Sequence, residues 1–362
     1  MAQSQHHYAL ILAGGRGTRF WPRSRARRAK QVLEIAGSGT LIQQTVKRLE
    51  PVIPRERVWI ITNPMLREEI IRQLPGVPRE QVLAEPVARN TAPAIGLAAQ
   101  VLSRVDPDAV LGVFPADHYI ARPAAFLRLV RAAYRAAAQG RMALIGIQPR
   151  WAETGYGYVE FPEGGLTPGS LKPATVVRFR EKPDAATARR FVEAGNYCWN
   201  AGMFFWRADV FLQALDTHLP RTAALLRRLP PSGSRRFRRV LNEVFPQCEN
   251  ISVDYAVLEH AQGVAGFAAG EIGWNDVGSW NAVYELLPRD AYGNAVRGDA
   301  ALVESSGNLI DAPPGKLVAL AGVNNLIVVD TPDALLICPR DMAQRVGDIV
   351  KLLERRQRNE LL

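Results

Sequence analysis

The chain has 362 residues, 48% of them hydrophobic and 22% charged, which excludes wholesale disorder and allows one large or two ordinary domains. Its formal net charge of +10 favours anionic partners: nucleic acid, acidic lipid or phosphorylated small molecules. The chain has three widely spaced cysteines, Cys198, Cys248 and Cys338, an odd number that argues against a disulfide framework or a zinc knuckle. No apolar run is long enough for a membrane helix. We therefore expect a cytoplasmic protein with no membrane partner.

Strand-like and helix-like segments alternate through the first part of the chain. Apolar runs typical of strands occupy 8–14, 58–63 and 143–147, and another lies within 110–120, at 110–114. Helical spacing of apolar residues occupies 41–49 and the alanine-rich 123–138. The first run ends in glycine and is too short for a signal peptide. This alternation predicts an α/β fold with a parallel or mixed, Rossmann-like sheet and helices on both faces.

The rhythm changes after residue 150. Strand-like pieces separated by Gly and Pro occur in GYGYVEF, TVVRFREKPD and AGMFFWRADVF, and we interpret them as an insertion that covers one edge of the sheet. Residues 217–242 contain seven arginines and no acid, with PPSGS in the middle. Two solvated helical segments joined by a loop are expected there.

The last part of the chain is rich in short β segments with Asn, Gly and Asp turns. TPD, between IVV and ALLIC, predicts a hairpin, and a final amphipathic helix follows, with Asp341 and Gln344 as a possible capping box. We place a boundary near 288, which separates a catalytic domain (1–287) from a C-terminal β-rich domain (288–362). The β-rich part suggests one irregular turn of a β-helix, and tails of this kind often pair subunits, so a homodimer is expected.

The stretch LAGGRGTRFWPRSRARRAK (12–30) joins glycines to many positive charges. Its spacing fits neither the dinucleotide-binding fingerprint nor the Walker P-loop. Glycines here let the backbone approach a ligand and turn its N–H groups toward phosphate oxygens, while Arg16, Arg19 and Lys30 can supply countercharge. The pattern indicates a triphosphate cradle; its candidate nucleotide-binding residues are Leu12, Ala13, Gly14, Gly15, Arg16, Gly17 and Thr18.

With Gln31 added, this stretch resembles the signature of the sugar-1-phosphate nucleotidyltransferases, with Ala29 in place of the usual proline and Phe20 in place of leucine. Further motifs narrow the resemblance to the mannose-1-phosphate guanylyltransferases, also called GDP-mannose pyrophosphorylases. They follow the family's order: EPVARNTAPAI (85–95), FPADHYI (114–120), GYGYVE (155–160), EKPD (181–184), WNAGMF (199–204), SVDYAVLE (252–259) and GWNDVGSW (273–280).

The resemblance implies a mixed sheet of the nucleotidyltransferase (GT-A-like) type and a small C-terminal domain like a left-handed β-helix. The implied reaction converts GTP and mannose 1-phosphate to GDP-mannose and diphosphate by in-line attack on the α-phosphorus, with Mg²⁺ as cofactor. The C-terminal part is shorter than the isomerase domain fused to some relatives, so a single activity is expected.

The resemblance also assigns roles. Asp117 and Asp276 hold the metal in the family, and Mg²⁺ prefers one or two carboxylates together with substrate phosphates. Asp117 follows the predicted strand at 110–114, at the carboxyl end where open α/β sheets bind ligands. The structural alternative for Asp117 is a helix cap, and the alternative for Asp276 is a turn aspartate that hydrogen-bonds its own backbone. Together with Arg19, Lys30 and Lys182, these two acids are the expected catalytic set.

Base and sugar recognition have separate candidates. Glu85 can accept the N1 and N2 hydrogens of guanine, which adenine does not offer as a pair. Asn90 and Thr91 add polar contacts or cap the next helix, and capping is the expected role of Thr91. By resemblance, the sugar and its phosphate are held by Gly157, Glu181, Lys182 and Asn200, with Asp254 in support.

Three alternatives remain open on the sequence. A related enzyme could use glucose 1-phosphate or another nucleotide. A non-catalytic regulatory subunit could bind nucleotide sugars without turnover, although an intact set of charged residues disfavours it. Nucleic-acid binding through the arginines of 221–239 is not expected, because no recognised module accompanies them and Phe237 is the single aromatic residue among them.

Overall fold

The computed structural model describes residues 5–362, which form two compact units. The first unit contains the chain up to Gly14 together with 46–116 and 120–274, and the second contains 15–45, 117–119 and 275–362. Each unit therefore gathers segments far apart in the sequence. The boundary near 288 stays a prediction about domains, since these units follow contacts in space rather than a single cut in the chain.

The first unit is built on a ten-stranded mixed sheet with the main strand order β3-β2-β1-β4-β10-β6-β11-β8, while β7 pairs with β10 and β9. The strands are β1 (His7–Leu12), β2 (Val58–Thr62), β3 (Val82–Ala84), β4 (Val110–Pro115), β6 (Ala143–Ile147), β7 (Tyr158–Glu160), β8 (Ala174–Thr175), β9 (Arg178–Arg180), β10 (Tyr197–Arg207) and β11 (Ala265–Ala269). β1, β2, β3 and β4 pair in parallel. β1, β2, β4 and β6 lie at the strand runs predicted for the first part of the chain, whereas β3 was not predicted.

One prediction about this sheet was wrong. The strand at 197–207 does not cover an edge: β10 lies inside the sheet, antiparallel to β4 on one side and to β6 on the other. Its second half is almost continuously buried, as expected of a strand with packed elements on both faces. A shift of register between Asn200 and Phe204 interrupts its pairing with β6 and marks where the strand leaves regular geometry, near a predicted sugar-binding residue.

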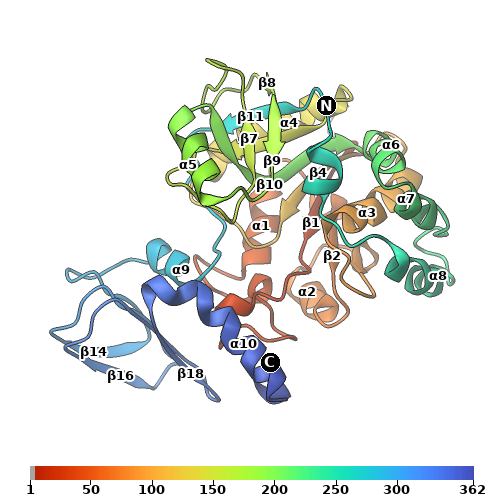
Figure 1. The fold of residues 1–362 in the computed structure, drawn as a ribbon. Helices are drawn as coiled ribbons and strands as arrows, with labels where there is room; N and C mark the ends of the chain where they lie inside the picture. The colour runs from red at the N-terminus through yellow and green to blue at the C-terminus, as the bar shows by residue number, and fades with distance from the viewer. Residues whose placement is uncertain (1–4) are drawn as a thin grey trace. The chain divides into compact units, whose positions relative to one another are not determined.

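Several helices contact strands of this sheet: α2 (Arg67–Gln73), α3 (Thr91–Val105), α4 (Pro123–Ala138), α5 (Ala185–Ala194) and α6 (Ala208–His218). α7 (Pro220–Arg227) packs on α3 and α6, and α8 (Phe237–Val244) contacts the 3-10 turn Phe245–Gln247. α1 (Leu41–Leu49) is the helix predicted at that position. Figure 1 shows α3 beside α6 and α7. The helices approach closely because Gly96 of α3 has no side chain; a β-carbon there would overlap Leu215 and Leu226. The arginine-rich segment forms α7, a loop and α8, as predicted.

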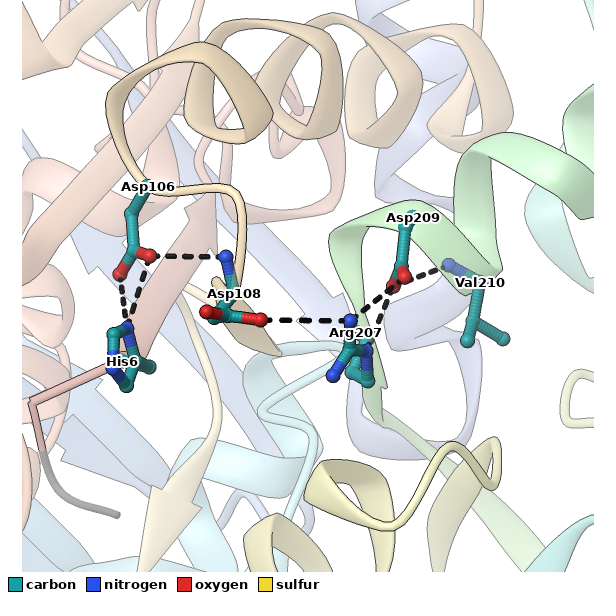
Figure 2. A network of polar contacts seen from close by, with 6 residues as sticks. All are labelled: His6, Asp106, Asp108, Arg207, Asp209 and Val210. Carbon is teal, nitrogen blue, oxygen red and sulfur yellow. Dashed lines mark hydrogen bonds and ion pairs between the residues drawn. The ribbon is translucent and has the colours of Figure 1, made fainter. Parts of the chain in front are cut away.

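A polar network ties the start of β4 to the end of β10 (Figure 2). The His6 Nδ1 lies 2.9 Å from both carboxylate oxygens of Asp106, which also accepts a 3.0 Å hydrogen bond from the backbone N–H of Asp108. Arg207 lies 3.7 Å from Asp108 and donates two hydrogen bonds to Asp209 in the first turn of α6. The network anchors the end of the sheet opposite the carboxyl ends of β1 and β4.

The second unit is β-rich. Parallel strands β13 (Ala295–Arg297), β15 (Leu309–Asp311) and β17 (Leu326–Asp330) form one ladder, and β14 (Asp299–Val303) and β16 (Leu317–Ala321) form another. β17 and β18 (Leu335–Pro339) make the antiparallel hairpin predicted around TPD. Short stretches β5 (Tyr119–Ile120) and β12 (Trp274–Asn275) lie where the chain passes from one unit to the other. Stacked parallel ladders of this kind confirm the predicted β-helix-like character.

A separate apolar core holds the second unit together. Trp280, at the start of α9 (Trp280–Leu286), is fully buried, contacts the ring of Phe20 at 5.4 Å and donates a 3.1 Å hydrogen bond to the backbone oxygen of Trp21. The glycine-rich signature is thus packed on the aromatic start of α9. Within residues 5–362, every helix is too short or too polar to span a membrane.

The predicted capping box at the last helix was wrong. A 3-10 segment occupies Arg340–Arg345, α10 begins only at Val346, and its N-cap residue Arg345 makes no capping bond through its side chain. Gln344 instead accepts a hydrogen bond from Arg19. A tertiary contact therefore takes the side chain that local spacing assigned to helix capping.

Candidate active site

The signature turn of the second unit is shaped by Gly17. This residue has a φ of 62°, in the left-handed region that favours glycine, and a β-carbon there would collide with the Lys30 side chain. Its backbone oxygen accepts a 2.6 Å hydrogen bond from the Ser24 hydroxyl. Gly17 is therefore required for the close approach of the turn to Lys30.

Lys30 is buried, with only 6% of its surface exposed, and its ammonium joins two predicted metal ligands. The Lys30 Nζ lies 2.8 Å from Oδ2 of Asp117 and donates a 2.9 Å hydrogen bond to the backbone oxygen of Asp276. Ala29 stands where relatives carry proline, yet its φ of −72° is the value that a proline ring imposes. The turn that places Lys30 is thus kept without the ring.

The two predicted metal ligands differ in their surroundings. Burial raises the pKa of Asp117, but the Lys30 ammonium and His118 lower it by more, so this carboxyl is held as the anion. Asp276 precedes Val277, whose φ of 47° is strained for a β-branched residue, and a β-carbon on Gly278 would overlap the Asp276 carboxylate.

The donor set fits a magnesium ion that also binds substrate phosphates. Asp117 and Asp276 can supply one or two carboxylates, the usual protein share for Mg²⁺. Among residues 5–362 no group of three or more His, Cys, Asp or Glu side chains forms a complete protein cage. A metal here would therefore depend on phosphate oxygens for the rest of its coordination.

Arg16 and Arg19, predicted to face the triphosphate, contact the C-terminal segment instead. Arg16 lies 2.8 Å from Glu354 on α10 (Val346–Arg355), and Arg19 donates a 2.7 Å hydrogen bond to Gln344. Both contacts are exposed, and ion pairs at exposed positions contribute little stability. Phosphate oxygens could therefore replace these partners at small cost.

In the first unit, the carboxyl ends of β1, β2 and β3 bring Ala13, Thr62 and Glu85 together. The Thr62 hydroxyl donates a 3.0 Å hydrogen bond to the backbone oxygen of Ala13, and the Glu85 N–H donates a 2.8 Å bond to the backbone oxygen of Thr62. The Glu85 carboxyl points to the predicted nucleotide stretch, with its Oε2 3.5 Å from where a β-carbon on Gly14 would stand.

Glu85 is buried and poorly satisfied. It is 8% exposed, its Oε1 has no hydrogen-bond partner within the described part of the chain, and burial raises its pKa to about 8. A buried carboxyl without donors is costly for folding, so a ligand that offers N–H groups would be favoured there.

Asn90, and not Thr91 as predicted, caps the start of α3. Asn90 is the N-cap residue and its side chain accepts a hydrogen bond from the Thr91 N–H. The Thr91 hydroxyl instead accepts a 2.8 Å bond from the backbone N–H of Val253. Asn90, with a φ of 65°, is left as the more exposed candidate for a ligand contact.

The four predicted sugar residues lie together in the first unit. Asn200 donates its backbone N–H to the Gly157 oxygen at 2.8 Å, and its amide donates a 2.9 Å bond to Asp254. A β-carbon on Gly157 would overlap the Glu181 carboxylate, whose other oxygen lies 3.2 Å from the Lys182 ammonium. The grouping is what a small polyhydroxy ligand requires: acceptors, a donor and a cation around a glycine.

Acidic residues dominate this group. Burial, together with Asp254, raises the pKa of Glu181 against the opposing effect of Lys182, and burial raises the pKa of Asp254. Glu259, which the sequence analysis missed, accepts a 3.1 Å hydrogen bond from the backbone N–H of Glu181. Its place in the SVDYAVLE motif was the available signal.

Aromatic rings form a wall in the same unit. Trp199 is fully buried and contacts Trp151, Tyr156 and Trp274 at ring distances of 4.8, 5.3 and 6.4 Å. Tyr156 and Trp199 thus belong to one packed group of rings. Trp151 and Trp274 were not singled out from the sequence.

Backbone strain coincides with the predicted site residues. Positive φ values at residues other than glycine occur at Asn90, Lys182 and Val277, beside or within three of the sequence motifs. Such conformations cost free energy and persist where function requires them. Further cases among residues 5–362 lie at Glu304, Asn325 and Gln357.

Comparison with known proteins agrees with this geometry. A family model described as nucleotidyl transferase matches residues 8–292, and one described as MannoseP isomerase/GMP-like beta-helix domain matches 298–353. A mannose-1-phosphate guanylyltransferase of Salmonella muenchen is 38% identical over 357 residues, covering 97% of this chain and 74% of its own length. The alginate biosynthesis protein AlgA of Pseudomonas aeruginosa is 38% identical, with 97% and 73% covered.

Two solved structures share the fold of this chain. A crystal structure from Thermus thermophilus, described as a mannose-1-phosphate geranyltransferase, matches with a TM-score of 0.84 and 33% identity over 96% of this chain and 99% of its own. A Helicobacter pylori protein described as mannose-6-phosphate isomerase, at 23% identity and a TM-score of 0.60, covers 75% of this chain and 99% of its own and shares the fold. The chain belongs to the nucleotidyl transferase family.

Proposed function

We propose that this protein is a mannose-1-phosphate guanylyltransferase, which converts GTP and α-D-mannose 1-phosphate to GDP-mannose and diphosphate. Relatives with that name, at 38% identity over 97% of the chain, support the proposal. The observation that carries the choice of base is the buried Glu85 carboxyl beside Gly14, with an oxygen that no described residue satisfies. The N1 and N2 hydrogens of guanine are a matching pair of donors.

The transfer needs positioning and charge neutralisation rather than a covalent intermediate on the protein. An oxygen of the sugar phosphate attacks the α-phosphorus as diphosphate leaves in line. The backbone of Gly14, Gly15 and Gly17 can approach the phosphates, and Lys30 with Arg16 and Arg19 can offset their charge. When bound by Asp117 and Asp276, Mg²⁺ would supply further neutralisation of phosphate charge.

The sugar half of the reaction is assigned to the group around Gly157. Glu181 and Asn200 can accept and donate hydrogen bonds to hydroxyl groups, and the absence of a side chain at Gly157 leaves room for the ring. Lys182, half exposed and within 3.2 Å of Glu181, is the cation available for the sugar phosphate. Base, metal and sugar residues therefore have separate, chemically suited environments.

We further propose a homodimer formed through the β-rich part of the second unit. Its strands expose several large apolar side chains, and a cluster of such side chains on a protein surface usually marks a site where another protein binds. They are Val303, Leu317, Leu335 and Ile337. Light scattering on a sizing column tests this: the protein should run as a dimer, and the Leu335→Asp/Ile337→Asp variant as a monomer. A wild-type monomer at micromolar concentration would contradict it.

One assay tests the activity. Diphosphate release is measured with GTP, ATP, UTP or dTTP against mannose 1-phosphate or glucose 1-phosphate, in Mg²⁺. GTP with mannose 1-phosphate should react fastest. Turnover with UTP or dTTP but not GTP would favour the related-enzyme alternative, and no diphosphate from any pair would favour the non-catalytic regulatory subunit.

A further inference from the structure

We propose that Lys30 occupies the cation position in the substrate-free protein and must leave Asp117 before a divalent metal can bind there. This inference rests on the proposed function, in which Asp117 and Asp276 hold the metal. Besides contacting the triphosphate, Lys30 then sets the order of binding: the nucleotide draws the ammonium away, and metal and nucleotide then bind together.

The Lys30 ammonium already contacts both residues assigned to the metal. Its two hydrogen-bond acceptors are Oδ2 of Asp117, at 2.8 Å, and the backbone oxygen of Asp276, at 2.9 Å. Both acceptors belong to the two residues assigned to the metal, so one positive group already bridges them. Oxygen ligands of this type, from carboxylates and backbone carbonyls, are also those that hard divalent cations take.

Competition follows from this arrangement. A cation that coordinated Oδ2 of Asp117 would have to displace the hydrogen bond that this oxygen accepts from Lys30. It would also meet the repulsion of a like charge within a few ångströms, because the Lys30 side chain is only 7% exposed and the Asp117 side chain 33% exposed, so water screens the two cations only in part. The bare protein should therefore bind a divalent ion weakly even though both carboxylates are present.

The two ends of the Lys30 side chain are held by different contacts. Its base packs against Gly17 and opens the 3-10 turn Lys30–Val32, whereas its ammonium is held by the two hydrogen bonds and lies 5.4 Å from the Phe20 ring centre. Only the outer bonds of the side chain need to rotate for the ammonium to release Asp117. A triphosphate, with several anionic oxygens, offers it stronger acceptors than one carboxylate and one carbonyl.

Mn²⁺ binding, measured by electron paramagnetic resonance on the full-length protein without nucleotide, tests the inference. Lys30→Met should bind Mn²⁺ about tenfold more tightly than wild type, within the usual range of coupling between sites. Lys351→Met removes the same charge from an exposed helix position and should match wild type. Adding Asp117→Asn to Lys30→Met should abolish the tighter binding.

The outcomes separate the two proposals. Equal Mn²⁺ affinity in wild type and Lys30→Met, with binding still dependent on Asp117, would overturn the role of Lys30 and leave the metal site intact. Binding that does not depend on Asp117 would overturn the metal assignment itself.

A second measurement uses the wild-type chain, in case Lys30→Met fails to fold. The rate at which an amine-acylating reagent modifies Lys30 is followed by mass spectrometry with and without saturating Mn²⁺. Release from Asp117 should raise this rate several-fold, with Lys351 unchanged. An unchanged rate at Lys30 in metal-saturated protein would overturn the inference.

Discussion

The ammonium of the buried Lys30 and the partly exposed carboxylate of Asp117 form an ion pair at 2.8 Å, although one residue follows the glycine-rich turn and the other follows β4. The pair also involves the backbone of Asp276, from a third segment of the chain. Three motifs spread over most of the sequence thus meet at one side chain. Charge placed this way, before any substrate arrives, is the kind of preorganisation on which phosphoryl-type transfer depends.

Asp117→Asn should lower kcat by about 100-fold or more, because the transfer loses an anionic metal ligand and its charge stabilisation. Steady-state diphosphate release checks this. Asp108→Asn, an exposed acid at the opposite end of β4, is the matched control and should retain wild-type kcat. Near-normal turnover of Asp117→Asn would argue against its metal role.

Glu85→Gln should raise KM for GTP by about tenfold while KM for mannose 1-phosphate changes little, since the amide replaces one acceptor of guanine hydrogens by a donor. Kinetics with each substrate varied in turn separate the two constants. An unaltered preference for GTP over ATP in this variant would show that the base is recognised by other groups.

GTP binding should depend on pH through Glu85. Its pKa is raised to about 8 by burial, so below this pH the carboxyl is protonated and must lose a proton to accept both guanine hydrogens. Wild-type affinity for GTP should therefore weaken as pH falls from 8 to 6, with protons released on binding. Calorimetry in buffers of different ionisation enthalpy measures the release, which Glu85→Gln should lack.

The same carboxyl should lower the free energy of unfolding as pH rises from 4.5 to about 8. Because its folded-state pKa of about 8 lies above the unfolded value of 4.5, the stability it contributes is present below pH 4.5 and is lost as pH rises through 8. Glu85→Gln should thus gain free energy of unfolding relative to wild type, by up to roughly 1.4 kcal/mol per pH unit across this window. Urea denaturation at pH 5 and pH 8 should show the larger difference at pH 8.

Gly157→Ala should damage the sugar site. The added β-carbon would overlap the Glu181 carboxylate and press on Phe179, so Glu181 must move from its position. We expect KM for mannose 1-phosphate to rise by about tenfold, with KM for GTP within a factor of two, a loss typical of one displaced polar contact. Gly233→Ala, where nothing lies within 4 Å of the new carbon, is the control and should be silent.

Glu354→Ala should leave kcat nearly unchanged, because the exposed Arg16–Glu354 pair contributes only about 0–1 kcal/mol to stability and Arg16 stays free to contact the phosphates. Arg19→Ala, in contrast, should raise KM for GTP, because it removes a guanidinium that can turn from Gln344 to the triphosphate. Activity and melting temperature are measured for both variants. A strong loss of activity in Glu354→Ala would mean that the helix contact, rather than the ligand, positions Arg16.

Local pattern was enough for much of this protein. The helices at 41–49 and 123–138 and the strands at 58–62 and 143–147 occur where apolar periodicity predicts them, because each is decided by neighbours a few residues away. The hairpin at TPD follows from turn chemistry in the same way. The motifs also pointed to the right family, since their residue types and order are properties of the chain itself.

What sequence alone determined, then, was the kind of segments and the chemistry they carry; tertiary structure decided which of them meet. β10 lies inside the sheet because it pairs with β4 on one side and with β6 on the other, and its own residues do not say which strands those neighbours are. The Lys30–Asp117 contact, the burial that raises the pKa of Glu85 and the turn of Arg16 toward Glu354 likewise depend on residues distant in the chain. Burial and charge pairing arise only when separate segments pack together, so no local pattern contains them.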